Sequence, residues 1–237
     1  MVPPRPWLLA LESAVAPEVA LLHGEELVAE RSCAGPAAET LLPAIAALLE
    51  QAGVALAELD AFAIAIGPGS FTGLRVGLAT LKGLAFASSR PAVAVPTLAA
   101  LACDAPPGEG PVVAALDARR NELYAAAFAL PDARALDWLP EGVYRLPALC
   151  AALRTPCRVV GEGAAIAAEA LRAAFGERAT LHAHCRPRAA AVGRLGLAGL
   201  RAGAGVPAAS LLPRYVRRAE AEARRTGLRV EPGSADL

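Results

Sequence analysis

The chain has 237 residues, of which 55% are hydrophobic, and its 23 basic and 23 acidic residues give a formal net charge of zero. High apolar content without net charge excludes an intrinsically disordered regulator. The balanced charge also argues against a protein whose main task is to grip nucleic acid by its phosphates.

We expect a cytoplasmic protein with no membrane segment. No run of residues approaches the roughly 20 apolar positions that a membrane-spanning helix needs. The apolar stretch near the start is broken at Glu12 and lacks a small-residue cleavage site, so we expect no signal peptide. The five cysteines are scattered and form no Cys-x-x-Cys pair, which suits free thiols in a reducing compartment.

The first hundred residues predict an alternation of strands and helices. Short apolar runs predict buried strands, and apolar residues three and four apart predict helices. We expect strands at Trp7–Leu11, Glu18–Leu22, Glu26–Arg31, Phe62–Ile66 and Ala92–Val95, and helices at Pro36–Ala52 and Ser70–Ala87. Gly53 should end the first of these helices, and Thr97 can cap a short helix after the last strand.

A linker-like composition at Cys103–Pro111 precedes a second set of elements. Strands are expected at Val112–Leu116, Leu123–Leu130, around Val143 and at Arg158–Val160, and helices at Pro147–Leu153, Ala164–Phe175 and Pro187–Ala202. Two sets of strands and helices predict an α/β protein of two similar lobes. We place the first lobe at residues 1–105 and the second at residues 106–205, with residues 206–237 able to pack back on the first.

The segment Ala61–Ala87, AFAIAIGPGSFTGLRVGLATLKGLAFA, is the most informative part of the sequence. A buried strand leads into a glycine turn that opens a helix, which is a suitable place for an anion. Ser70 or Thr72 can cap that helix. The glycine spacing fits neither the Walker loop nor the dinucleotide fingerprint.

Glycines inside the same helix cost about 1 kcal/mol each relative to alanine. They indicate either tight packing on the protein's own sheet or a second helix that approaches closely, such as one from another chain. Three glycines in one helix favour the close neighbour.

This segment closely resembles the signature of the bacterial TsaB family, formerly called YeaZ. Further matches follow in chain order, and together they span nearly the whole chain: LLALES, ETLLPAIAALLE, AVPTLAALA, LDARRNELYAAAF, VVGEGA and LLPRYVRR. The resemblance implies a two-lobed fold of the actin/Hsp70/sugar-kinase (ASKHA) type with a reduced second lobe.

The resemblance also implies a role as a non-catalytic subunit. It would pair with TsaD and, together with the ATPase TsaE, support the installation of threonylcarbamoyl on N6 of the adenosine next to the anticodon. The tRNAs concerned read codons that begin with A, and contact with tRNA would come only through the assembled complex. A homodimer is possible when the chain is alone.

Pairing is expected through first-lobe helices at about Glu39–Glu50 and Ser70–Ala87. The expected partner-binding residues are Leu41, Ile45, Leu48, Gly73, Arg75, Val76, Gly77, Thr80, Leu81, Gly83 and Leu84. We expect Gly77→Leu to abolish pairing and to leave the fold largely intact. The residues that match the family's motifs in structural roles are Gly67, Pro68, Gly69, Ser70, Phe71, Thr72, Asp117, Arg119, Glu122 and Tyr124.

The residues present do not favour catalysis. Catalytic members of this fold place an aspartate where this chain has Glu12, and Asp117 is followed by Ala-Arg-Arg rather than by phosphate-binding glycines. No histidine lies between His23 and His182, so the histidine pair of TsaD-like proteins is missing. We expect no catalytic residue, metal or cofactor. The alternative is an active ATP-dependent phosphotransferase or a metallopeptidase of the same fold.

Three further groups each have two readings. His182, His184 and Cys185 form either a partial metal site or a solvated edge, and the edge is favoured because no third ligand has suitable spacing. Asp117, Arg119, Glu122 and Tyr124 are either an acid–base site or a local ion pair, and the ion pair is favoured. A basic tail is either a tRNA contact or a solvated helix face, and contains Arg214, Arg217, Arg218, Arg224 and Arg225.

Overall fold

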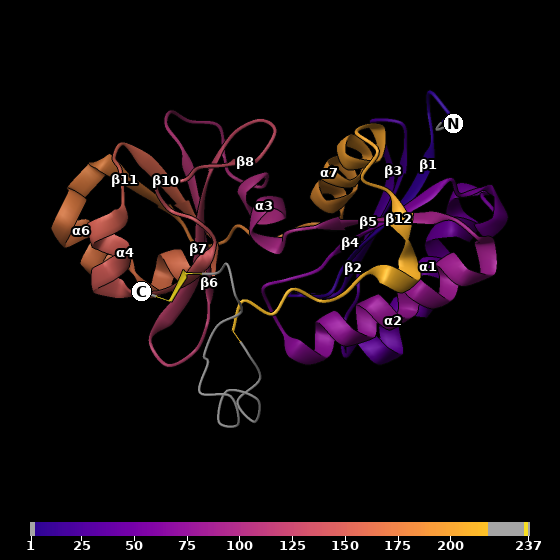
Figure 1. The fold of residues 1–237 in the computed structure, drawn as a ribbon, viewed down its shortest axis with the longest axis horizontal. Coiled ribbons are helices and arrows are strands. Elements are labelled where there is room, and N and C mark those ends of the chain that lie inside the picture. Colours follow the sequence, from indigo (N-terminus) through magenta and orange to yellow (C-terminus); the bar gives the residue numbers. More distant parts are fainter. Residues whose placement is uncertain (1–2, 218–234, 237) are drawn as a thin grey trace. The chain divides into compact units, whose positions relative to one another are not determined.

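The computed structural model describes residues 3–217 and 235–236. The chain divides into two compact units, Met1–Ala100 with Pro187–Arg214 and Leu101–Arg186 with Tyr215–Leu237. Each unit contains a β-sheet and helices that pack on it (Figure 1). The α/β class and the organisation in two sheet-centred lobes are therefore as predicted.

The sheet of the first unit has six strands in the order β12-β5-β4-β1-β2-β3. The strands are β1 (Trp7–Glu12), β2 (Glu18–His23), β3 (Glu26–Ser32), β4 (Ala61–Ala65), β5 (Pro91–Val95) and β12 (Val206–Pro207). β1, β2 and β3 pair antiparallel, whereas β4 runs parallel to both β1 and β5. Parallel strands need a long crossover, and the helix between β4 and β5 supplies it.

Helices cover both faces of this sheet. α1 (Ala37–Ala52) and α2 (Phe71–Ser88) lie on one face, and α7 (Ala189–Arg201) lies on the other (Figure 1). Leu9 and Leu11 of β1 join the core under α1 and α2. The intervening Ala10 lies beside Gly193 of α7. Alternate strand residues thus point to opposite helical layers, which explains why β1 and β4 are apolar at nearly every position.

The second unit is built on a sheet with the strand order β11-β10-β6-β7-β9-β13, and β8 pairs with β7 beside it. The strands are β6 (Val112–Asp117), β7 (Glu122–Ala129), β8 (Arg134–Ala135), β9 (Gly142–Arg145), β10 (Cys157–Val160), β11 (Ala179–His182) and β13 (Ala235–Asp236). Its helices are α4 (Leu146–Ala152), α5 (Glu162–Ile166) and α6 (Ala168–Phe175), and α3 (Thr97–Ala102) contains the division between the units. Short 3₁₀ helices lie at Leu56–Glu58, Gly176–Arg178 and Ala208–Ser210.

Most predicted elements lie within two residues of their expected bounds, but one predicted helix is divided. The region Ala164–Phe175 forms α5 and α6, which meet at Ala167. Thr97 also differs from expectation: its hydroxyl accepts the N–H of Gly67 at 3.0 Å, so it ties α3 to the loop after β4.

The helix expected at Pro187–Ala202 belongs to the first unit, whereas we had placed it in the second lobe. Its glycines allow a close approach to the first sheet, because a Cβ at Gly193 would collide with Leu22 and one at Gly196 with Ala63. Chain position alone does not reveal such a return of the chain. Between residues 3 and 217, no helix is long and apolar enough to cross a lipid bilayer.

Candidate functional site

The glycine loop between β4 and α2 packs against the turn that follows β1. The N–H of Ser70 donates to the carbonyl of Ala14 at 2.6 Å. A side chain at Gly69 would collide with that same carbonyl. Ser70 caps α2 as predicted, because its hydroxyl accepts the N–H of Gly73 at 3.1 Å. These contacts join the two turns into one compact structure at the ends of β1 and β4.

Glu12 is fully buried within the turn after β1. Its carboxyl oxygens accept the N–H groups of Ala14 at 2.7 Å, Val15 at 3.1 Å and Ala16 at 3.0 Å. Burial raises the pKa of Glu12 to about 8, against the opposing effect of these three hydrogen bonds, and nearby Glu18 raises it further. The amide groups of this turn are thus taken up by the chain's own side chain rather than turned outward toward an anion.

Two glycines of α2 lie over this turn, contrary to their assignment as partner contacts. A Cβ at Gly73 would collide with the backbone carbonyl of Ser13, and one at Gly77 with the Ser13 hydroxyl. The expectation that Gly77→Leu leaves the fold intact is therefore wrong. Tight packing within the chain, the reading that we did not favour for these glycines, accounts for both of them.

Several other residues expected to bind a partner are in the core of the first unit. Leu41, Ile45, Leu48 and Leu81 are all 2% exposed or less and belong to the cluster beneath α1 and α2. The resemblance implied that these helices pair with a partner, but it did not say which face of each helix does so, and apolar residues three and four apart form the buried stripe of a helix as readily as a docking stripe. Val76 and Leu84 are half-buried against the same core, and Thr80 is half-buried.

The outward face of α2 consists of other residues, only two of which we predicted. Arg75 is exposed and lies over the Phe71 ring at 3.7 Å, and Gly83 faces open space. The exposed positions follow helical spacing along one stripe: Thr72, Arg75, Ala79, Gly83 and Phe86. Phe86 is 88% exposed, and Leu42 on neighbouring α1 is 54% exposed. The signal that the sequence offered for this surface was a large apolar residue, Phe86, at helical spacing from the small residues Ala79 and Gly83.

The polar residues of the second unit form ion pairs at the β6–β7 hairpin. Asp117 accepts the N–H of Arg119 at 2.6 Å and a guanidinium N–H of the same residue at 2.9 Å. Glu122 is buried and pairs with Arg217 and Arg145. The pKa of the half-buried Tyr124 is raised by burial and then by Asp117. The expected local ion pair is therefore present, and it holds a turn in which Arg119 and the two residues after it have positive φ.

The histidine pair is not arranged as a strand-borne ligand set. β11 ends at His182, and the two imidazole rings meet edge to face with centroids 6.2 Å apart. Cys185 is buried and lies 3.4 Å from the carbonyl of Asp104. Among residues 3–217 and 235–236, no group of three or more histidine, cysteine or acidic residues could hold a metal ion.

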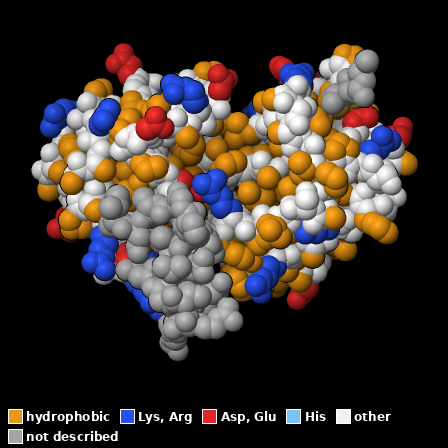
Figure 2. Space-filling model, in the orientation of Figure 1, with side chains coloured by type: hydrophobic (Ala, Val, Ile, Leu, Met, Phe, Trp, Pro, Cys, Tyr) orange, Lys and Arg blue, Asp and Glu red, His pale blue; other side chains and the backbone are white. Residues whose placement is uncertain are grey.

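Charge is mixed rather than concentrated on the face of the molecule drawn in Figure 2, where basic and acidic side chains are interspersed. Of the predicted basic tail, Arg217 is engaged with Glu122, and the backbone of Arg214 donates to Ile66 at 2.7 Å. Arg218, Arg224 and Arg225 lie outside the described residues.

Comparison with known proteins identifies the family of this chain. The model of the TsaD family, described as tRNA N6-adenosine threonylcarbamoyltransferase, matches residues 32–224. The tRNA threonylcarbamoyladenosine biosynthesis protein TsaB of Haemophilus influenzae is 41% identical over 122 residues, which cover 49% of this chain and 51% of that protein. A tRNA N6-adenosine threonylcarbamoyltransferase of Novosphingobium aromaticivorans is 52% identical over 58 residues, 24% of this chain and 17% of that one.

The chain spans about half the length of the curated TsaB proteins it matches. Among solved structures, a Pseudomonas aeruginosa protein described as similar to peptidase YEAZ is 34% identical, with a TM-score of 0.75. That similarity covers 90% of this chain and all of the other, so the two-lobed fold extends over nearly the whole chain.

The contrast between inward and outward glycines of α2 is testable. Gly73→Ala should lower the free energy of unfolding by about 1–3 kcal/mol, because the new methyl group meets the Ser13 carbonyl. Gly83→Ala, in the same helix but facing open space, should raise it by up to about 1 kcal/mol. Urea unfolding followed by circular dichroism measures both. Equal effects of the two substitutions would contradict the packing described above.

The buried Glu12 carboxyl should make stability depend on pH. Its folded-state pKa of about 8 lies above the ordinary glutamate value of 4.5, so between these two pH values the folded chain keeps a proton that the unfolded chain releases. Raising the pH from about 5 to about 8 should therefore lower the free energy of unfolding. In Glu12→Gln this contribution is absent. The free energy of unfolding of the wild type should therefore fall relative to that of the variant as the pH rises through this range. A difference that stays constant with pH would show that Glu12 does not titrate there.

Proposed function

We propose a non-catalytic, partner-binding role for this chain, which belongs to the tRNA N6-adenosine threonylcarbamoyltransferase family and resembles its TsaB (YeaZ) relatives in sequence and fold. In this role it supports the formation of N6-threonylcarbamoyladenosine next to the anticodon of tRNAs that read codons starting with A. It does so by pairing with a TsaD subunit, with the ATPase TsaE joining the larger complex. Such work on tRNA fits a cytoplasmic location.

The observation that carries the non-catalytic part is the buried Glu12. A phosphate-binding turn presents free backbone N–H groups to its ligand, but here Glu12 accepts those of Ala14, Val15 and Ala16. The second unit offers ion-paired side chains at the β6–β7 turn in place of a glycine cradle. Both features argue against nucleotide chemistry in this chain alone and leave the reacting groups to the partner.

The outward face of α2 supports the pairing part. Ala79 and Gly83 let the backbone of another helix approach closely, and exposed Phe86 adds apolar area at one end. A transferase relative is 52% identical to this chain over 58 residues, so a partner from the same family is expected to share part of this fold. The same surface suits a second copy of this chain, which makes a homodimer the expected state when the partner is absent.

An enzyme of the same fold remains the competing function, and the name of one solved relative refers to a peptidase. ATP turnover and peptide hydrolysis by the purified chain test it directly. Under the proposed function both are indistinguishable from buffer, and modification of tRNA appears only when the organism's TsaD and TsaE are added. Turnover by the chain alone would contradict the proposal.

Substitution on the outward face of α2 tests the pairing. Ala79→Arg should weaken association with the TsaD subunit at least about tenfold, since a long charged side chain would separate the two helices. Ala198→Arg is the matched control, because Ala198 is also exposed but lies on α7, across the sheet. Co-purification with sizing and calorimetry measures the effect. Retained affinity in Ala79→Arg would place the interface elsewhere.

A further inference from the structure

A pocket lies beside the C-terminal end of α2, within the first unit. Its cavity volume of about 820 Å³ falls in the range typical of ligand-binding clefts, about 300–1,000 Å³. α2, the start of β5, β12 and the following 3₁₀ helix line it: Lys82, Ala85, Phe86, Ser89, Arg90, Pro91, Gly205, Val206, Pro207, Ala208 and Ala209. The family role described above does not use this pocket.

The charged groups of the pocket are all positive. Lys82 donates to the carbonyl of Ala209 at 3.1 Å, and Arg90 donates to that of Ala57 at 3.0 Å. A carbonyl oxygen accepts a hydrogen bond but does not neutralise a charge, and no carboxylate occurs among the described residues that line the pocket. Nε of Arg90 is buried and has no acceptor within the described part of the chain.

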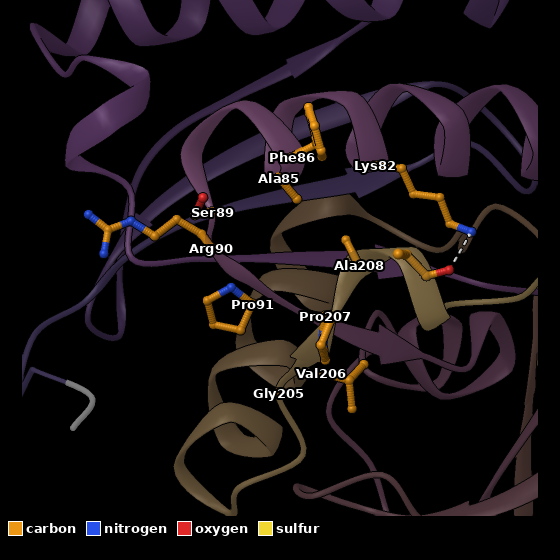
Figure 3. A pocket seen from close by; sticks show the side chains of 11 residues that line it. Lys82, Ala85, Phe86, Ser89, Arg90, Pro91, Gly205, Val206, Pro207 and Ala208 are labelled. Carbon is orange, nitrogen blue, oxygen red and sulfur yellow. Dashed lines mark hydrogen bonds between the residues drawn. The ribbon is translucent and has the colours of Figure 1, made fainter.

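The two cations stand apart with apolar surface between them. Figure 3 shows the Lys82 and Arg90 side chains extending away from one another, with Ala85, Pro91 and Ala208 in the space between. Lys82 lies before the last turn of α2, so the helix dipole does not account for its position. The pocket therefore matches a ligand that has an apolar centre and negative charge on both sides.

The pocket adjoins the outward face of α2. Phe86 is the shared residue: it lines the pocket and, at 88% exposure, ends the stripe that begins at Thr72. A helix docked along the stripe would therefore bring neighbouring chain to the pocket mouth. Exposed aromatic side chains next to a hollow are the usual anchors of protein interfaces.

We propose that the pocket receives a segment of the partner subunit in which acidic side chains flank an apolar one. The apolar side chain packs on Ala85, Pro91 and Ala208, and one carboxylate pairs with Lys82 and another with Arg90. This inference rests on the proposed pairing and adds to it a second, charge-selective contact. Because the charges on the two sides are opposite, they speed encounter and fix the register in which the helices meet.

Two substitutions test the pocket by different means. Lys82→Glu reverses one charge, and Ala209→Trp fills the cavity from an exposed position without changing charge. Each should weaken binding to the purified TsaD subunit at least tenfold in calorimetry. The affinity of Lys82→Glu should also depend less on salt than that of the wild type. Lys82→Arg keeps the charge and should bind within about threefold of the wild type.

Arg194→Glu is the control for net charge, because Arg194 is exposed on α7, across the sheet from α2. It should leave the affinity within twofold of the wild type, and thermal unfolding checks that every variant is folded. If Ala79→Arg abolishes pairing while Lys82→Glu and Ala209→Trp bind as the wild type does, this inference fails and the proposed pairing stands. If all three bind normally, the proposed pairing itself fails. If the pocket variants change only self-association, measured by sedimentation of the chain alone, the occupant is a second copy and the inference is overturned.

Discussion

The first unit depends on how closely α2 approaches the turn after β1. At Gly73 the helix lies so near the Ser13 carbonyl that a methyl group would collide with it, and a methyl group at Gly69 would likewise collide with the Ala14 carbonyl. The turn is held from within by the Glu12 carboxyl and from outside by the Ser70 N–H. The signature therefore needs glycine at these positions for the chain's own packing, before any ligand or partner is considered.

This packing separates the two faces of α2. Gly77 is used inward, against Ser13, whereas Gly83 meets nothing within 4 Å of where its side chain would lie. Glycine in the middle of a helix lowers its stability. Close packing inside the chain offsets this loss at Gly77, but no contact within the described part of the chain offsets it at Gly83. The outward stripe of small residues that ends at Phe86 is the part of the helix that the fold leaves unexplained.

The sequence alone predicted where the strands and helices lie, but it did not predict which residues of a helix face the core and which face outward. Strand and helix positions follow from local apolar spacing, and the cap at Ser70 follows from local chemistry. Whether a glycine of a helix faces the core or the solvent does not follow from local sequence. Gly73 and Gly83 look alike in sequence and differ only in the atoms that a side chain there would meet. Leu41 and Leu48 were misassigned for the same reason. α7 shows the remaining gap: its return to the first sheet depends on contacts with strands more than a hundred residues earlier.

The zero net charge of the chain does not mean that charge is balanced at every site. The 23 basic and 23 acidic residues cancel over the whole chain, and in much of the structure they cancel locally as well, as at Arg188 with Glu30 and Arg217 with Glu122. Lys82 and Arg90 are different, because they donate hydrogen bonds to carbonyl oxygens and their charge is not offset within the pocket that they line. Neighbouring apolar surface strengthens an unbalanced charge by lowering the local dielectric. Under the proposed pairing, a neutral subunit selects its partner electrostatically at one end of α2, while the small residues along that helix determine how near the partner comes.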